Sequence, residues 1–256
     1  ITALQHLSGW FFLGRFVSLD MRLSISGTAC QGKSTLITDF LEKWSMYESP
    51  KETYRDKLVK DKHSKDTTPD NQWSILDFML EQLQTYRKGD HVIFDRCPLD
   101  NIVYSLWAAD KGIDGFDTEF IDKCIPLVRE SMKFIDIMFF IPITSAAPVE
   151  IEGDGIRETD KEYISEIDNI FKAMYQQWIS PDSRFFPSDD KPAIIEIFGN
   201  RVERIRMMQL YLDEDSGEMV DGEGIMDVGE VEGIERQFRN SGSGYTNTND
   251  VKKFII

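Results

Sequence analysis

Short apolar runs alternate with longer amphipathic segments over most of the chain. The apolar runs have the length of buried strands, and they occupy residues 22–26, 91–95, 134–143 and 193–199. The amphipathic segments have helical periodicity, and they occupy residues 34–44, 71–89, 99–111, 117–131, 157–179 and 201–212. Strands that alternate with helices in this way indicate a parallel sheet covered by helices on both faces. We therefore predict an α/β fold, a three-layer sandwich around a mainly parallel sheet.

Two of these helices carry signals for their ends. Asp117 stands where an N-cap is expected, and Gly89 stands where a C-cap is expected. The helix over 157–179 is indicated by a single apolar face, formed by Ile164, Ile167, Ile170, Phe171 and Met174.

A phosphate-binding motif lies between the first predicted strand and the first predicted helix. The sequence GTACQGKST contains Gly27-x-x-x-x-Gly32-Lys33-Ser34, which matches the whole motif in the expected strand–loop–helix context. Glycines let the backbone turn closely around an anion, and its N–H groups then point inward at the positive end of the helix dipole. We expect Lys33 to reach the β- and γ-phosphates and Ser34 to bind Mg²⁺. The predicted nucleotide-binding residues are Gly27, Thr28, Ala29, Cys30, Gln31, Gly32, Lys33, Ser34 and Thr35.

The second predicted strand ends in Asp95 and Arg96. Ligands of open α/β sheets bind outside the carboxyl ends of the strands, so both side chains are expected beside the phosphate loop. Asp95 would hold the Mg²⁺ water shell or accept a proton, and Arg96 would clamp a transferred or acceptor phosphate. The alternative is an ordinary salt bridge in a turn.

Residues 152–160, EGDGIRETD, form a Gly-rich hinge followed by Arg157. A mobile lid that carries an arginine over bound phosphates excludes water and supplies positive charge to the transition state. We therefore predict a catalytic role for Arg157. The alternative is a solvated loop with an arginine at a helix start.

Residues 46–56 are expected at the tip of a strand on the acceptor side of the crevice. Glu48 would act as the base that takes a proton from an acceptor hydroxyl, and Arg55 would bind a charged group of the acceptor. Gln72 and Trp73 open the next helix toward the same crevice, where an amide beside an aromatic ring suits a planar base. The alternatives are surface charges on a loop and a core tryptophan.

The net charge of −16 is concentrated near the end of the chain. Residues 213–235 hold ten acidic and no basic residues, which leaves a net charge of −6 for the rest. This body has no basic stripe of the kind that binds duplex DNA, although residues 51–65 lean basic. The Cys and His residues are scattered without metal-binding spacing, and three cysteines fit a reducing cytoplasm. No apolar window reaches the roughly 18 residues of a membrane-spanning helix.

We expect three parts along the chain. Residues 1–20 precede Met21 as an N-terminal extension, and residues 21–212 form the catalytic domain. Residues 213–256 are acidic and Gly-rich with little periodicity, so we expect most of this tail to be mobile or loosely packed.

The chain resembles the nucleoside and nucleotide kinases among P-loop proteins, and most of all the family with the ribosylnicotinamide-kinase domain and phage-type P-loop kinases. The resemblance covers residues 21–211 and is carried by the phosphate loop, by Asp95-Arg96 with the following PLDNIVYS, and by Gly155-Ile156-Arg157. The sequence ESP at 48–50 is similar to the Glu-x-Pro element of deoxynucleoside kinases. The resemblance implies a sheet of about five strands, a Mg²⁺–ATP requirement, and an acceptor pocket between residues 46–72 and the lid.

The first hypothesis is thus a cytoplasmic Mg²⁺–ATP phosphotransferase that acts on a nucleoside, a nucleotide or a similar small acceptor. A second hypothesis places the acceptor, a hydroxymethyl-pyrimidine, within DNA. A third is a regulatory module that binds ATP or GTP without transferring phosphate, although no guanine-specificity element is visible. No membrane partner is expected, and a homodimer is left open.

Overall fold

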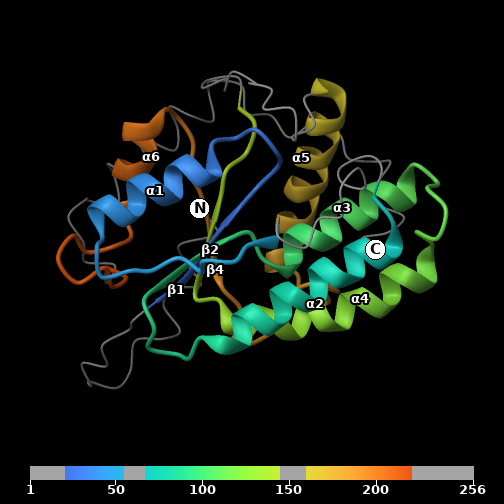
Figure 1. The fold of residues 1–256 in the computed structure, drawn as a ribbon, viewed down its shortest axis with the longest axis horizontal. Coiled ribbons are helices and arrows are strands. Elements are labelled where there is room, and N and C mark those ends of the chain that lie inside the picture. The colour runs from blue at the N-terminus through green and yellow to red at the C-terminus, as the bar shows by residue number, and fades with distance from the viewer. Residues whose placement is uncertain (1–20, 55–66, 145–159, 221–256) are drawn as a thin grey trace.

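The computed structural model describes residues 21–54, 67–144 and 160–220, and the following account concerns those residues. Four parallel strands form one sheet within them, in the order β2-β1-β3-β4 (Figure 1). Their bounds are Arg22–Ser26 for β1, Val92–Asp95 for β2, Ile137–Phe140 for β3 and Ala193–Glu196 for β4. All four carboxyl ends therefore meet at one edge of the sheet.

The described part of the chain has four strands where about five were expected. Next to β2, Glu48 makes a single parallel bridge with Val92. The bridge has both of its hydrogen bonds, from Glu48 N to His91 O and from Ile93 N to Glu48 O. The next bond of a parallel ladder would need the N–H of residue 50, which is Pro50 and has none. The edge pairing therefore stops after one residue.

Helices cover both faces of the sheet (Figure 1). On one side lie α1 (Lys33–Lys43) and α6 (Arg201–Met208). On the other side lie α2 (Pro69–Thr85), α3 (Pro98–Asp110), α4 (Thr118–Ser131) and α5 (Lys161–Gln176), with short 3₁₀ turns at Met132–Phe134 and Gln177–Ile179. This arrangement confirms the predicted α/β three-layer sandwich. Within the described ranges, no helix is both long and apolar enough to cross a membrane.

Alternating strand residues divide the core into two parts. Phe94, Met138 and Phe140 point toward α3 and α5, and they belong to the larger cluster. Ile25, Ile93 and Phe139 point to the opposite face, where they pack with α1 and α6. Successive residues of a strand point to opposite faces of the sheet. Because helices cover both faces, the short strands are apolar at almost every position.

Most predicted elements are present with shifted ends. Asp117 is confirmed as the N-cap of α4, because its side chain accepts a hydrogen bond from Phe120 N at 2.9 Å. The prediction for Gly89 was wrong: α2 ends at Thr85, and Tyr86 already has an extended backbone. Gly89 instead takes a φ of 113° in the turn before β2.

The first residues of the acidic tail pack on the domain. Trp44 Nε1 donates to Asp213 O at 2.8 Å, Tyr47 OH donates to Gly217 O at 2.7 Å, and His91 Nε2 lies 3.2 Å from Ser216 O. The expected loose packing therefore does not hold for residues 213–220. The rest of the tail, like the extension 1–20, lies outside the described residues.

Candidate active site

The phosphate loop connects β1 to α1 at the carboxyl edge of the sheet, as the sequence predicts. Gly27 has a φ of 138°, and a Cβ there would lie 2.7 Å from Ile141 O in the neighbouring chain segment. Gly32 has a φ of 70° and is the N-cap of α1. The first position therefore excludes a side chain by contact and by backbone conformation, and the second favours glycine by conformation.

Lys33 begins α1 and lies under the loop. It is buried, and its Nζ donates to Thr28 O across the loop. An ammonium group held at the mouth of a helix N-terminus adds a full charge to the inward backbone dipoles. The loop is thereby built to receive an anion.

Ser34 and Asp95 come together although 61 positions separate them. Ser34 Oγ lies 3.4 Å from Asp95 Oδ2, at the point where β2 ends. A hydroxyl and a carboxylate oxygen beside a phosphate loop are hard ligands, and Mg²⁺ takes such ligands together with water and phosphate oxygens. The two residues thus fit a Mg²⁺ site completed by nucleotide and water. Among the described residues, no group of three or more His, Cys, Asp or Glu side chains is placed to hold a metal by itself.

Arg96 follows directly and is buried against the loop. Its Nη1 donates to Gly27 O at 2.9 Å and to Asp100 Oδ1 at 3.0 Å. Its guanidinium carbon lies 5.3 Å from the ring centre of Tyr54 and 5.1 Å from that of Tyr104. Burial works against the charge, but Tyr104, Tyr54 and Asp100 together raise the pKa of Arg96 well above its ordinary value. The structure therefore places a permanent cation beside the first residue of the loop.

Asp100 is a site residue that the sequence analysis missed. Its side chain is fully buried, and it accepts hydrogen bonds from the end of β1 and from the start of α3. The available signal was its position, four residues after Arg96 and three after Cys97 at the start of a helix. In the sequence, the stretch PLDNIVYS is singled out only by the resemblance to P-loop kinases.

Arg204 is a second missed residue, contributed by α6. Its Nη1 donates to Gln31 O at 2.5 Å and its Nε donates to Gly199 O at 2.8 Å. Burial lowers the pKa of Arg204. No local pattern could place it here, because the loop it supports is more than 170 positions earlier.

Gln72 of α2 is buried and makes hydrogen bonds with Asn101 of α3. Asn101 Nδ2 donates to Gln72 Oε1 at 2.7 Å and to Gln72 O at 3.0 Å, while Gln72 Nε2 donates to Thr67 Oγ1 at 2.9 Å. Asn101 Oδ1 is buried without a hydrogen-bond partner in the described structure. Of the two residues, only Gln72 was predicted from the sequence. In the structure, Gln72 and Asn101 form an amide pair.

Glu48 is not brought to the site. It pairs with Val92, three residues before Asp95, and its carboxylate bonds to Tyr86 beyond the far end of α2. Burial and then Glu48 raise the pKa of Tyr86. Tyr86 and Gln72 are 14 positions apart, which corresponds to about 20 Å along a helix.

The chain after Glu48 runs back along α2 toward the site. Gln82 Nε2 donates to Glu52 O at 2.7 Å, and Tyr54 then reaches Arg96. Tyr54, and not Glu48, is therefore the residue of this segment that lies against Arg96. Arg55 and Arg157, with the expected lid, lie outside the described residues.

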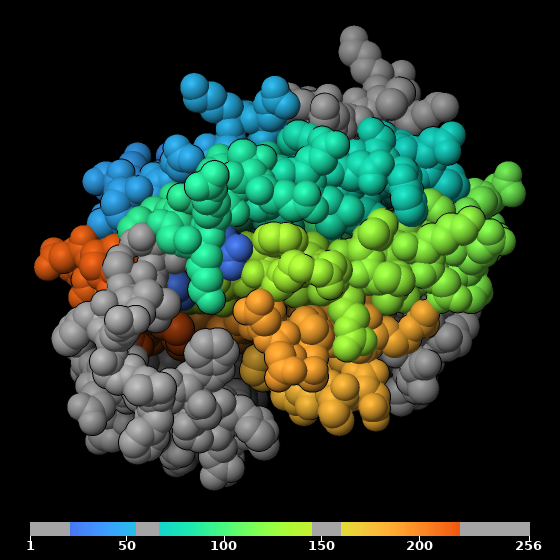
Figure 2. All heavy atoms as spheres, turned by 90° about the horizontal axis from the view of Figure 1, so that it is seen from below, coloured from blue at the N-terminus to red at the C-terminus, as the bar shows by residue number. Residues whose placement is uncertain are grey.

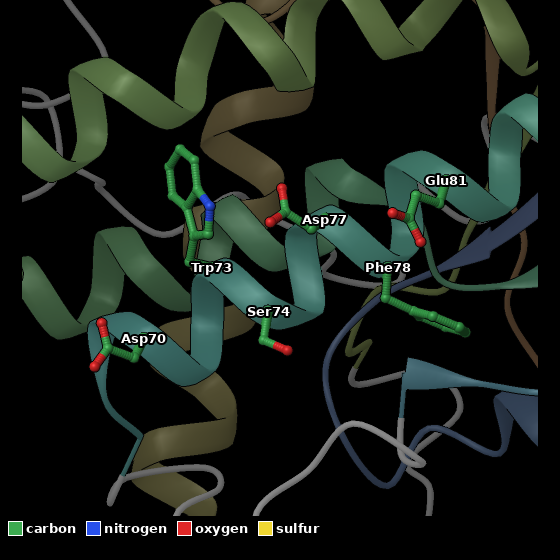
Figure 3. Close-up of a pocket in the computed structure, with 6 residues that line it drawn as sticks. All are labelled: Asp70, Trp73, Ser74, Asp77, Phe78 and Glu81. Carbon is green, nitrogen blue, oxygen red and sulfur yellow. The ribbon is translucent and has the colours of Figure 1, made fainter.

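Two surface hollows lie on the opposite side of α2 from Gln72. One has a volume of about 370 Å³ and is lined by Asp70, Trp73, Ser74, Asp77, Phe78 and Glu81 (Figure 3). The other, of about 420 Å³, continues from Trp73 to α4, which lies beside α2 on the face shown in Figure 2. Their carboxylates disfavour phosphate binding. Trp73 lines both hollows and packs on Phe120 against the core, so it lies on the other side of α2 from Gln72 and not toward the crevice as expected.

Comparisons with known proteins agree with this geometry. An AAA domain family model matches residues 22–181, more than half of the chain. The structure of deoxyadenosine kinase from M. mycoides with products dCMP and a flexible dCDP bound is 17% identical, with a TM-score of 0.51, covering 86% of this chain and 100% of that chain. Thymidylate kinase from Candida albicans is 14% identical, with a TM-score of 0.56, covering 78% of this chain and 95% of that chain. No curated protein matches the chain.

At these identities the solved structures show the fold, and they confirm the predicted likeness to P-loop nucleoside and nucleotide kinases. The matched residues 22–181 include the phosphate loop, the Ser34–Asp95 pair and the buried Arg96. The chain therefore belongs to the AAA domain family.

Proposed function

We propose that the protein is a Mg²⁺–ATP-dependent phosphotransferase that moves the γ-phosphate to a nucleoside, a nucleotide or a similar small acceptor. The proposal rests on the complete phosphate loop together with the side chains of Asp95 and Arg96, which lie beside it. Lys33 lies under the loop, Ser34 meets Asp95 at 3.4 Å, and Arg96 contacts Gly27 O at 2.9 Å. A phosphoryl transfer enzyme needs positioning and charge stabilisation more than it needs covalent chemistry.

Each residue has a defined role in this proposal. The backbone of residues 27–32 and Lys33 bind the β- and γ-phosphates. Ser34 and Asp95 would hold Mg²⁺, which when bound neutralises charge on the β- and γ-phosphate oxygens. Arg96 balances the charge that develops on the transferred group.

The transfer itself requires one bond to form and one to break. An oxygen of the acceptor attacks the γ-phosphorus, the bond to the bridging oxygen of the β-phosphate breaks, and ADP leaves. For a hydroxyl acceptor, Asp95 takes the proton, because it lies at the end of β2 beside the loop and would hold Mg²⁺ through the water shell of the ion, not as a direct ligand. Glu48 does not lie beside the loop, because its carboxylate contacts Tyr86.

The acceptor class rests on the amide pair Gln72–Asn101. Amide groups fixed in a buried site are suited to the donor and acceptor edge of a nucleobase. Asn101 Oδ1 is buried without a described partner, so it is ready to accept a hydrogen bond from such an edge. The structural neighbours support this class, since one is a deoxyadenosine kinase with dATP bound (18% identical, TM-score 0.52, covering 74% of this chain and 97% of that chain) and another is a thymidylate kinase.

The proposal is tested with γ-labelled ATP, Mg²⁺ and a panel of acceptors. The panel contains free nucleosides, nucleoside monophosphates, ribosylnicotinamide and hydroxymethylated DNA. We expect the label to move to a nucleoside or nucleotide. Label on DNA alone would assign the polymer as acceptor, and label released only as inorganic phosphate would contradict a transferase.

Lys33→Ala and Lys43→Ala are the matched variants for this assay. Both lysines belong to α1, but Lys43 lies in its last turn and pairs with Glu214 on the surface. Transfer should be lost in the first variant and retained in the second. Equal transfer by both would show that the label moves without the phosphate loop.

A further inference from the structure

Asp100 joins the two strand ends on which the site is built. From the β1 side it accepts hydrogen bonds from Ser26 Oγ at 3.0 Å and from Gly27 N at 3.3 Å. From the β2 side it accepts from Arg96 Nη1 at 3.0 Å and from Cys97 N at 3.1 Å. A single carboxylate thus holds the first residue of the phosphate loop and the cation beside it.

Asp100 does more than cap α3, because its buried carboxylate also forms an ion pair with Arg96. A fully buried carboxylate is costly unless it is paired and hydrogen-bonded. The cation in contact with it is Arg96, and the same Nη1 also reaches Gly27 O. Asp100 and Gly27 O therefore hold the guanidinium group of Arg96, and the rings of Tyr54 and Tyr104 lie beside it, with their centres 5.3 and 5.1 Å from its carbon.

We propose that Asp100 is a positioning residue for phosphoryl transfer, which holds Arg96 and the phosphate loop in one fixed geometry. The inference rests on the proposed function and adds a residue that acts through others. Rates of positioned reactions fall by about 100-fold for a misplacement of about 1 Å. Without the carboxylate, Arg96 keeps its charge but loses the partner that sets its direction.

The test combines Asp100→Asn, Arg96→Ala and the double variant. Asparagine keeps the shape but removes the charge and turns an NH₂ group toward some of the present donors. We expect Asp100→Asn to lower kcat by about 10- to 100-fold, with a smaller change in the KM of the acceptor. At saturating ATP, where the separate contact of Asp100 with Gly27 N does not limit the rate, the double variant should be no slower than Arg96→Ala alone, because Asp100 acts on kcat through Arg96. Multiplication of the two losses, or a kcat within about twofold of the wild type, would overturn the proposal.

A second variant separates positioning from packing and does not depend on whether Asp100→Asn folds. Ser26→Ala removes a neutral donor to Asp100 and the contact with Tyr175 OH, but it leaves the contacts of Asp100 with Arg96 and Gly27. We expect a lower melting temperature and a kcat within about threefold of the wild type. A loss of kcat as large as that of Arg96→Ala would show that the whole network, and not the fixed arginine, governs the rate.

ATP binding measured by calorimetry distinguishes this inference from the proposed function. Because Gly27 N donates to Asp100, Asp100→Asn should also weaken ATP binding, by about 10-fold. A wild-type protein that binds ATP but transfers to no acceptor would contradict the proposed function, and the change in ATP affinity would still test Asp100. A wild-type protein that transfers phosphate while Asp100→Asn matches it in rate and affinity would contradict only the role of Asp100.

Discussion

The donor side and the acceptor side of the site are built in different ways. The donor side that we propose is one continuous stretch, Gly27 to Thr35, in which Lys33 Nζ donates to Thr28 O at the start of α1. The acceptor side that we propose consists of Tyr54, Gln72, Arg96 and Asn101, which come from three separate segments. A local motif brings its own geometry with it, whereas a composite surface depends on how distant segments pack.

The difference predicts separate responses to mutation. Changes on the donor side should affect ATP binding, and changes on the acceptor side should affect the acceptor. Arg96 and Asp100 lie at the junction and should affect both.

The largest effect is expected for Gly27→Ala. A Cβ at this position would lie 2.7 Å from Ile141 O, and the backbone φ is 138°. We expect ATP affinity to fall by about 100-fold or more, because the loop must move to admit the methyl group. Calorimetric titration with ATP measures the change.

Gly112→Ala is the matched control for that variant. Gly112 also has a positive φ, of 68°, but a Cβ there meets nothing within 4 Å. It should lose stability through backbone strain and keep its ATP affinity. Similar ATP affinities for both variants would contradict the assignment of Gly27 to the nucleotide site.

Asn101→Ala should act on the acceptor side alone. The change removes the donor to Gln72 Oε1 and the buried Oδ1. We expect the KM of the acceptor to rise by about 10- to 100-fold, while the KM of ATP stays within about twofold. Steady-state kinetics with each substrate varied in turn provides the measurement. Parallel increases in both KM values would refute a separate acceptor side.

Tyr47→Phe should act on stability without touching the site. Tyr47 OH donates to Gly217 O at the opposite end of the sheet. Loss of this hydrogen bond is expected to lower the free energy of unfolding by about 1 kcal/mol, and kcat should not change. Denaturant unfolding and the transfer assay are compared on the same preparation. A large loss of kcat would mean that residues 213–220 communicate with the site.

The smallest effect is expected for Glu48→Gln. The carboxylate lies beside Tyr86, far along α2 from Gln72. We expect kcat to remain within about twofold of the wild type. A loss of about 100-fold or more would restore Glu48 as the base.

Local signals in the sequence predicted the alternation of elements and the phosphate loop. The run RLSIS followed by GTACQGKST contains both the strand and the turn that leads into α1, so little else is needed to place Lys33 and Ser34. The position of Asp95 followed from a general property of parallel sheets. Asp95 is therefore beside Ser34, as the sequence analysis expected.

The remaining positions depend on contacts that sequence reasoning could not see. Glu48 was placed by the expected position of residues 46–56 at the tip of a strand, but Pro50 ends the edge pairing and the chain turns back along α2. Arg204 and Asp100 are buried and contact segments that are distant in the sequence. Which residues are buried together depends on how the layers pack, and a local sequence pattern does not show this. Gly89 was assigned to a helix end because the pattern did not show that Tyr86 leaves α2 to pack on Phe94.

Phosphate transfer to a small acceptor is tested most directly by the rate of ADP formation with and without a nucleoside or nucleotide, measured for the wild-type protein and for Lys33→Ala. We expect ADP formation that depends on the acceptor in the wild type and is lost in Lys33→Ala, with Lys43→Ala unaffected. ADP formation at the same rate with and without every acceptor, or no ADP formation by a wild-type protein that binds ATP, would contradict this expectation.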